Sequence, residues 1–303
     1  MTAESYVETF LDRERREVER ALARVVEALL AGAPDRVATP IRYALGTGGK
    51  RIRPILCVAA YRAVRDGEPP PALYDLAASL ELVHTYSLIH DDLPGMDDDD
   101  VRRGRPSTHR AHGTAPAIVS GAALIPLACR AAAEAAAALG LGEPGRAALV
   151  HELCVAAGAG GMVGGQVADL EAEGRSITAT ELEEIHRRKT GALLTAALRL
   201  GAVAAEARPP VLEALTSYGR AVGLAFQIAD DLLDVTGRSE VTGKTGGRDL
   251  ELAKATFPAL LGVEGARKRA EGEVAGALAA LAAGGVSSRE LDALARYAVE
   301  RDR

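Results

Sequence analysis

Apolar residues recur at spacings of three and four along almost the whole chain, which restricts it to packed helices. The pattern is clear in residues 11–30 (LDRERREVERALARVVEALL) and 182–200 (LEEIHRRKTGALLTAALRL), where this spacing places the apolar side chains on one helix face. Alanine and leucine, which favour helices, dominate, and runs that alternate apolar and polar residues like a half-buried strand are missing. The sequence predicts an all-α fold.

Short segments rich in glycine and proline separate the expected helices. They lie at residues 46–49, 66–71, 140–145, 174–176, 207–210, 237–247 and 284–288. None resembles an interdomain linker, and the chain has no fixed-period repeat. We therefore expect a single domain over residues 1–303, built as one helical bundle.

Composition and charge exclude several classes of protein. The net charge of -6 and the scarcity of aromatic residues disfavour a nucleic-acid-binding protein. The charged N-terminus lacks an apolar signal core, and the apolar run 274–286, taken as the longest, is too short and too rich in glycine to span a membrane. Cys57, Cys129 and Cys154 are far apart in sequence, which indicates buried thiols in a reducing compartment. We expect a soluble cytoplasmic protein without a membrane span.

The strongest chemical signal is an acidic run at residues 90–107, HDDLPGMDDDDVRRGRPS. Six aspartates fall between Asp91 and Asp100, and Pro94 with Gly95 bends the chain so that their carboxylates gather. Two carboxylates ~4 Å apart repel by roughly 4 kcal/mol at an effective dielectric of ~20. This run therefore predicts a site that holds positive charge.

A second acidic cluster lies in the apolar helical segment 226–237, FQIADDLLDVTG. Helical spacing puts Asp234 on the same face as Asp230 and Asp231, and no lysine or arginine lies between residues 221 and 237. Hard oxygen ligands in two facing clusters suit Mg²⁺, which keeps waters and completes its shell with substrate phosphate oxygens. The two clusters together predict a divalent-metal site for a phosphorylated ligand.

Basic residues near the first cluster supply the charge that phosphate needs. Arginine forks and lysine ammonium groups are its usual binders. For two of the basic residues, Arg51 and Arg105, the alternative explanation is a surface charge that balances the acidic net charge. The basic residues are Lys50, Arg51 and Arg53 in GGKRIRP, and Arg102, Arg103 and Arg105 after the aspartates.

Six ordered motifs resemble those of the trans-type isoprenyl diphosphate synthases, or polyprenyl synthetases, over nearly the whole chain. The resemblance implies a bundle of long antiparallel helices around a central cavity, usually in a homodimer. It also implies condensation of isopentenyl diphosphate with an allylic diphosphate, with three Mg²⁺ ions per site and Mn²⁺ as a possible substitute. The motifs are GGKRIRP at 48–54, DDLPGMDDDDVRRG at 91–104, GMVGGQVADL at 161–170, HRRKTGALL at 186–194, FQIADDLLD at 226–234 and GKTGGRDLELAKATFP at 243–258.

The same resemblance implies a role for each matching residue. Family positions for isopentenyl diphosphate are matched by Lys50, Arg53, His84 and Arg103. The magnesium ligands are matched by Asp91, Asp92, Asp97, Asp230, Asp231 and Asp234. Positions that line the allylic diphosphate are matched by Arg102, Lys189, Thr190, Gln227, Lys244 and Lys254.

Tyr86 bears on product length. It lies five residues before Asp91, roughly 7.5 Å along a helix axis, so that its ring should close the pocket for a growing prenyl chain. With the small Ser87 beside it and the insertion of Pro94 and Gly95, the pattern resembles the bacterial farnesyl diphosphate synthases. Geranylgeranyl diphosphate synthases are the alternative.

Two residues depart from the family pattern, and two other classes of protein stay open. Ala122 replaces a usual aspartate and His112 a usual aromatic residue, which leaves room for altered rate or substrate preference. A class I terpene cyclase usually lacks the second aspartate-rich motif and the basic site, both of which this chain has. A noncatalytic subunit of a heteromeric prenyltransferase commonly loses one aspartate motif, and here Ala122 is the only hint of such a loss.

Overall fold

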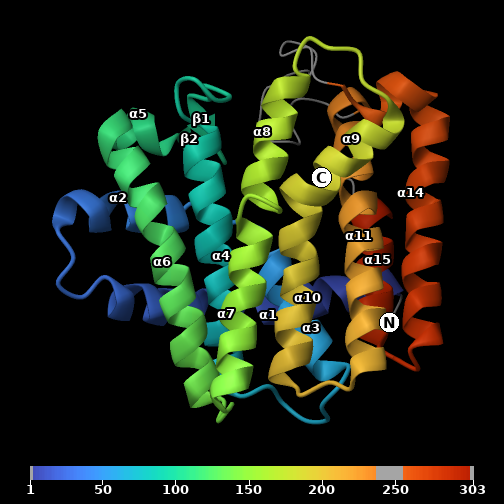
Figure 1. Cartoon of the computed structure of the whole chain (residues 1–303), viewed down its shortest axis with the longest axis horizontal. Helices are drawn as coiled ribbons and strands as arrows, with labels where there is room; N and C mark the ends of the chain where they lie inside the picture. The colour runs from blue at the N-terminus through green and yellow to red at the C-terminus, as the bar shows by residue number, and fades with distance from the viewer. Residues whose placement is uncertain (1–2, 237–254, 301–303) are drawn as a thin grey trace.

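The computed structural model describes residues 3–236 and 255–300, which form a bundle of helices (Figure 1). The predicted all-α class is confirmed, with one small exception. A two-residue hairpin, β1 (Val101–Arg102) and β2 (Arg105–Pro106), follows the first acidic run. The helices are α1 (Ala3–Leu29), α2 (Asp35–Leu45), α3 (Ile52–Arg62), α4 (Pro71–Asp91), α5 (Thr108–His112), α6 (Thr114–Ala138), α7 (Glu143–Ala157), α8 (Met162–Ala172), α9 (Ala179–His186), the π-helical turn η1 (Arg187–Gly191), α10 (Ala192–Ala204), α11 (Pro209–Thr236), α14 (Phe257–Ala283) and α15 (Arg289–Glu300).

Helix α4 is the central element of the bundle. Every residue from Leu76 to Val83 is buried, so α4 is enclosed on all sides, as expected for a helix without a polar face. It packs against α1, α3, α6 and α10. In Figure 1, α4, α6, α7, α10, α11 and α14 stand side by side, whereas α1 and α2 run across them. This packing fixes the end of α4, where the first aspartates lie.

The expected breaks separate the helices as predicted. The segments 46–49, 66–71, 140–145, 174–176, 207–210 and 284–288 each lie at a junction between two helices. The remaining break, 237–247, lies outside the described residues. The expected helix over 182–200 is continuous, but η1 interrupts its α-helical hydrogen bonding at Arg187–Gly191.

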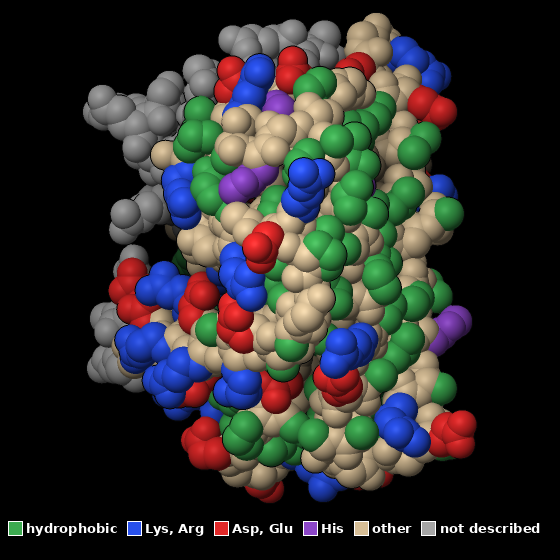
Figure 2. Space-filling view, turned by 90° about the vertical axis from the view of Figure 1, so that its left-hand side faces the viewer, with side chains coloured by type: hydrophobic (Ala, Val, Ile, Leu, Met, Phe, Trp, Pro, Cys, Tyr) green, Lys and Arg blue, Asp and Glu red, His purple; other side chains and the backbone are tan. Residues whose placement is uncertain are grey.

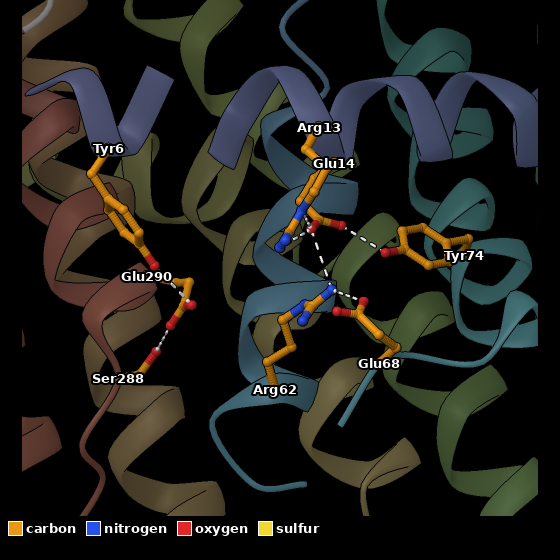
Figure 3. A network of polar contacts seen from close by, with 8 residues as sticks. All are labelled: Tyr6, Arg13, Glu14, Arg62, Glu68, Tyr74, Ser288 and Glu290. Carbon is orange, nitrogen blue, oxygen red and sulfur yellow. Dashed lines mark hydrogen bonds and ion pairs between the residues drawn. The ribbon is translucent and has the colours of Figure 1, made fainter. Parts of the chain in front are cut away.

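A buried carboxylate joins α1 to the centre of the bundle (Figure 3). The Glu14 side chain is fully buried, and its Oε2 accepts a hydrogen bond of 2.7 Å from Tyr74 of α4. Its Oε1 lies 2.7 Å from Arg13 and 3.4 Å from Arg62 of α3. Removing the partners would leave the Glu14 carboxylate as an uncompensated buried charge, which typically costs about 3–5 kcal/mol, so these contacts fix α1 relative to α3 and α4.

The expectation for the cysteines is correct only for Cys57. That thiol is buried, and burial raises its pKa. Cys129 on α6 is half-buried and Cys154 on α7 is exposed, and their sulfur atoms lie 3.5 Å apart as free thiols. Two adjacent antiparallel helices bring together residues that are distant in sequence.

The apolar run 274–286 is not the longest apolar stretch, contrary to our expectation. Helix α6 and the segment Glu143–Ala172, which holds α7 and α8, are long and apolar enough to cross a membrane by length and composition alone. In the structure α6 packs on α4, and α7 packs on α10. The outward side chains Ile118, Val119 and Val155 are nevertheless exposed. Figure 2 shows apolar side chains running down one side of that view.

Candidate active site

The two acidic clusters lie at the same end of the bundle, at the top of Figure 1. Asp91 is the last residue of α4, and Asp230 and Asp234 lie near the end of α11. Helix α8 reaches this end as well (Figure 1), and the turn η1 packs against it. The fold therefore brings together four of the six sequence motifs.

The turn after α4 gathers carboxylates, as Pro94 and Gly95 predict. The backbone N–H of Asp97 donates to the carbonyl of Asp91 over 2.9 Å, and Gly95 adopts a φ of 91°, which favours glycine. The pKa of Asp91 is raised to about 6: burial raises it most, the charge of Lys189 of η1 lowers it, and the charge of Asp97 raises it. Asp91 thus lies among carboxylates with a lysine facing it.

This pKa predicts that Mg²⁺ binding to the ligand-free protein weakens below pH 7. The ionised fraction of a carboxyl group with a pKa near 6 falls from about nine tenths at pH 7 to about one tenth at pH 5. We expect the Mg²⁺ affinity, measured by calorimetry, to fall about tenfold over this range. The Asp91→Asn variant should bind more weakly and without this slope. Equal wild-type affinities at pH 5 and pH 7 would contradict the prediction.

Asp92 forms an ion pair with Arg102. Its side chain is buried, and its Oδ1 accepts a hydrogen bond of 2.9 Å from Arg102 Nε. Burial alone would lower the pKa of Arg102, but the bond to Asp92 and the charge of Asp99 raise it. Arg102, which the family resemblance assigns to the allylic diphosphate, is therefore neutralised here by a carboxylate.

The residues of the second cluster have different environments. Asp230 lies close enough to Arg53 of α3 for its negative charge to raise the pKa of that guanidinium. Asp234 is half-buried. Asp231 is buried, and its Oδ2 accepts a hydrogen bond of 2.9 Å from the backbone N–H of Phe257. The Nε2 of His186 lies 3.7 Å from the same oxygen. Asp231 thus anchors the start of α14, a role that the sequence analysis missed.

The basic residues around α3 form a positive cluster. Arg53 has a buried Nε without a hydrogen-bond partner among the described residues. Burial lowers the pKa of Arg53, while the charges of Glu81 and Asp230 raise it. Burial, followed by the charges of Arg53 and Arg103, also holds the pKa of His84 well below its usual range. This region has a neutral imidazole and a guanidinium with hydrogen-bonding capacity to spare, which suits an anion.

The β hairpin positions the paired arginines. Arg103 and Gly104 have φ values of 54° and 74°, which is typical of a two-residue type I′ turn. Arg103 donates to the carbonyl oxygen of Gly48. At Gly49 the backbone φ is 144°, which favours glycine, and a Cβ there would lie 2.9 Å from the Arg103 guanidinium, so a side chain at this position would displace that guanidinium.

Arg51 is not a surface charge, contrary to one of our readings. It is 3% exposed and is paired with Glu19 and Glu81. Arg105 is exposed at the surface as expected, with its guanidinium 4.5 Å from the centroid of the Tyr43 ring. Arg51 is thus structural, which leaves Arg53 as the more available guanidinium of this motif.

The turn η1 places Lys189 at the site. Its Nζ lies 2.6 Å from Asp169 Oδ2 of α8, and Thr190 beside it is buried. A Cβ on Gly165 would lie 2.2 Å from the Lys189 backbone nitrogen, so only glycine permits this approach. Gln166, next to it, has both amide atoms buried without partners in the described chain. The motif GMVGGQVADL was the sequence signal for this contact.

Tyr86 and Ser87 lie on α4 before the acidic end. The half-buried Tyr86 ring packs edge-on against His90, with 4.8 Å between the ring centroids. His90 in turn packs on Gly121 of α6, where a Cβ would lie 2.5 Å from the imidazole. The Ser87 hydroxyl donates to the carbonyl of His84 over 2.9 Å. An aromatic pair thus occupies the space between α4 and α6 below Asp91.

The remaining sequence candidates lie as follows. Gln227 is half-buried on α11, and Lys50 is exposed. Lys244 and Lys254 lie outside the described residues. Of the two departures, Ala122 is exposed on α6, and His112 packs edge-on against Tyr43, with 4.9 Å between the ring centroids.

The later part of the first acidic run comes together with a histidine. Within residues 3–236 and 255–300, one set of three metal-ligating side chains has all its ligand atoms within 4.8 Å of one another: Asp98, Asp100 and His109. The sequence analysis missed His109, because its nearness to the aspartates depends on the hairpin.

Comparisons with known proteins agree with this geometry. The profile of the family described as "Polyprenyl synthetase" matches residues 34–283. The chain is 42% identical over 267 residues to the farnesyl diphosphate synthase of Geobacillus stearothermophilus, covering 88% of each chain. It is 42% identical over 292 residues to the farnesyl diphosphate synthase of Escherichia coli (strain K12), covering 95% of this chain and 96% of the other.

A solved structure extends the comparison to the fold. The structure of a geranyltransferase from Helicobacter pylori, complexed with magnesium and isoprenyl diphosphate, superposes with a TM-score of 0.80 at 28% identity, covering 96% of each chain. Sequence and fold therefore point to the same group of proteins.

Proposed function

The chain belongs to the polyprenyl synthetase family, and from this premise we propose that it condenses isopentenyl diphosphate with allylic diphosphates to form farnesyl diphosphate. The observation that carries the proposal is the pairing of opposite charges at one end of the bundle. The charge of Lys189 lowers the pKa of Asp91, and the charge of Asp230 raises the pKa of Arg53. A site with carboxylates and cations in alternation fits a diphosphate together with divalent metal ions.

The carboxylates fit Mg²⁺ as a cofactor. The donors are hard oxygens, and the pKa of Asp91 is raised first by burial and then also by the neighbouring carboxylates Asp97 and Asp92, both of which a bound cation would offset. Asp91, Asp97, Asp230 and Asp234 would hold the ions, and we propose three per site, with Mn²⁺ as a possible substitute. When bound, the ions would neutralise the departing diphosphate, which is the main electrostatic contribution to such a reaction.

The protein's own residues would bind and orient the two substrates. Lys50, Arg53 and Arg103 would hold the diphosphate of isopentenyl diphosphate, with neutral His84 beside them. The allylic diphosphate would be surrounded by Arg102, Lys189, Thr190 and Gln227. Arg102 would leave its ion pair with Asp92 and bind the diphosphate instead. The allylic carbon–oxygen bond breaks, the isopentenyl double bond attacks the allylic cation, and the released diphosphate takes the proton. Lys244 and Lys254 complete this proposed set.

A product assay tests the proposed function. Purified protein is incubated with Mg²⁺, isopentenyl diphosphate and, separately, dimethylallyl, geranyl or farnesyl diphosphate, and the dephosphorylated products are sized by chromatography. We expect farnesol as the end product. Geranylgeraniol would support the family activity but show that the product is geranylgeranyl diphosphate. No condensation would favour a noncatalytic subunit, and a cyclised hydrocarbon from farnesyl diphosphate alone would indicate a terpene cyclase.

Replacing Tyr86 with alanine should lengthen the product beyond farnesyl diphosphate. The ring and its partner His90 fill the space between α4 and α6, and removing the ring opens room for further isoprene units. The matched control is Tyr86→Phe, which keeps the ring and loses only the hydroxyl, and it should keep the wild-type product. If Tyr86→Ala also makes only farnesyl diphosphate, another residue limits the chain length.

We further propose a cytoplasmic, single-domain protein that forms a homodimer through the outer faces of α6 and α7. The exposed side chains Ile118, Val119 and Val155 support this, because apolar patches mark protein contacts. Light scattering should give about 63 kDa, twice the 31.5 kDa chain mass. Val119→Glu should give the monomer mass, whereas Val263→Glu on α14 should not. A wild-type monomer would contradict the proposal.

A further inference from the structure

A buried imidazole nitrogen near the first acidic cluster lacks a hydrogen-bond partner in the described part of the chain. His109 of α5 has a side chain that is 2% exposed, and its Nε2 is buried without such a partner. Its Nδ1 lies 3.0 Å from the Ser107 hydroxyl. A buried polar atom without a partner destabilises a protein, so a group that binds Nε2 would stabilise the fold.

Two carboxylates face this nitrogen. The ligand atoms of Asp98, Asp100 and His109 all lie within 4.8 Å of one another. The Nε2 of His109 and the Oδ1 of Asp98 are 3.9 Å apart, which is too long for a hydrogen bond. Both aspartates are exposed, with side-chain exposures of 57% and 65%. The Asp98 side chain can therefore turn toward a shared ion, whereas Asp100 is held in an ion pair with Arg110.

The separation fits an ion placed between the two atoms. Zinc lies about 2.0–2.2 Å from nitrogen and carboxylate oxygen, so two of its ligands stand roughly 3.4–4 Å apart. We propose that Asp98, Asp100 and His109 form a second metal site, which binds a divalent transition metal ion of the zinc type. This site is separate from the magnesium positions at Asp91 and Asp230.

The donor set favours a transition metal over Mg²⁺. An imidazole nitrogen suits zinc, copper, iron or nickel, whereas Mg²⁺ prefers a shell of oxygen atoms. The Ser107 hydroxyl fixes the ring through Nδ1, as outer partners of metal-bound histidines do. Arg110 pairs with Asp100 and must share that carboxylate with the ion. Water would fill the open coordination positions.

An ion at this site would link the acidic turn to α5. Asp98 and Asp100 belong to the turn that also carries Asp97, and Asp97 bonds to the backbone of Asp91. The ion would therefore restrict the movement of a residue that we assign to the magnesium site. The site does not depend on the proposed activity, because metal binding is measured without substrates.

Calorimetric titration with Zn²⁺, and absorption spectroscopy with Co²⁺, test the proposal. Both use the full chain in excess Mg²⁺, so that the magnesium positions are filled. We expect one Zn²⁺ per chain and a Co²⁺ spectrum of mixed nitrogen and oxygen ligation. His109→Gln and Asp98→Asn should each weaken Zn²⁺ binding at least about tenfold. The control His151→Gln removes an exposed histidine outside the site and should bind as the wild type does.

Two results would overturn the proposal. One is a wild-type protein that binds no Zn²⁺ in excess Mg²⁺, which would mean that Asp98, Asp100 and His109 do not form a metal site. The other is unchanged binding in both His109→Gln and Asp98→Asn, which would place the ion elsewhere. Because Asp98 is exposed, its variant should keep the wild-type circular dichroism. It therefore tests the site even if His109→Gln does not fold.

Discussion

Replacing either Asp91 or Asp230 with asparagine should lower magnesium-dependent turnover by roughly 10²–10³-fold, the usual cost of removing one main electrostatic group from an active site. Asparagine keeps the shape of the side chain but not the charge that a metal ion needs. The two residues lie at the ends of different helices, α4 and α11, so the pair tests both acidic clusters. Steady-state kinetics at saturating substrates, with Mg²⁺ varied, measures the loss.

Asp75→Asn is the matched control for this prediction. Asp75 also lies on α4, but near its other end, where it pairs with Arg24 at 2.5 Å. Surface pairs of this kind contribute about 0–1 kcal/mol, so turnover should stay within a factor of two or so of the wild type. Circular dichroism should be the same for all three variants. Full activity in either Asp91→Asn or Asp230→Asn would remove that cluster from the proposed metal site.

Replacing Arg53 with methionine should raise the KM for isopentenyl diphosphate by about ten- to a hundredfold. The guanidinium has a buried Nε without a partner among the described residues, and a charge-assisted hydrogen bond from it to phosphate is worth about 1.5–3 kcal/mol. Methionine keeps the apolar stem. The KM for the allylic substrate should change little, because Arg53 belongs to the other diphosphate position in our proposal.

Arg65→Met provides the comparison for Arg53. Arg65 lies just after α3, is exposed, and pairs with Glu206 at 2.5 Å. Its loss should leave both KM values unchanged. If Arg53→Met raised the KM for the allylic substrate alone, Arg53 would belong to the allylic diphosphate position instead. Unchanged values for both substrates would remove Arg53 from the site.

The helices and their boundaries could be predicted because they depend on local properties. Spacing of apolar residues determines which face is buried, and clusters of glycine and proline mark the breaks between helices, although single prolines such as Pro40 and Pro126 lie inside α2 and α6. The bend at Pro94 and Gly95 is local too, and the bond from Asp97 to Asp91 confirms it. The hairpin also had a signal, because Gly104 follows Arg103 at a position that requires a positive φ.

Contacts between distant segments could not be predicted in this way. Arg51 is buried because Glu19 and Glu81 approach it from α1 and α4. Asp231 bonds to Phe257, which is 26 residues away. The contact of Cys129 with Cys154 depends on how α6 and α7 pair. Each of these contacts depends on which helices become neighbours, and local patterns in a single sequence do not reveal that.

The aspartates of the two main clusters do not form a closed cage. In the part of the chain that the structure describes, neither cluster brings three ligand atoms within 4.8 Å of one another. If the diphosphate supplies the missing ligands, metal ions and allylic substrate must bind cooperatively. Thermodynamic linkage then requires that each strengthen the binding of the other by the same factor. The substrate would in effect complete its own cofactor site, and the protein would discriminate against molecules that lack a diphosphate before any bond is broken.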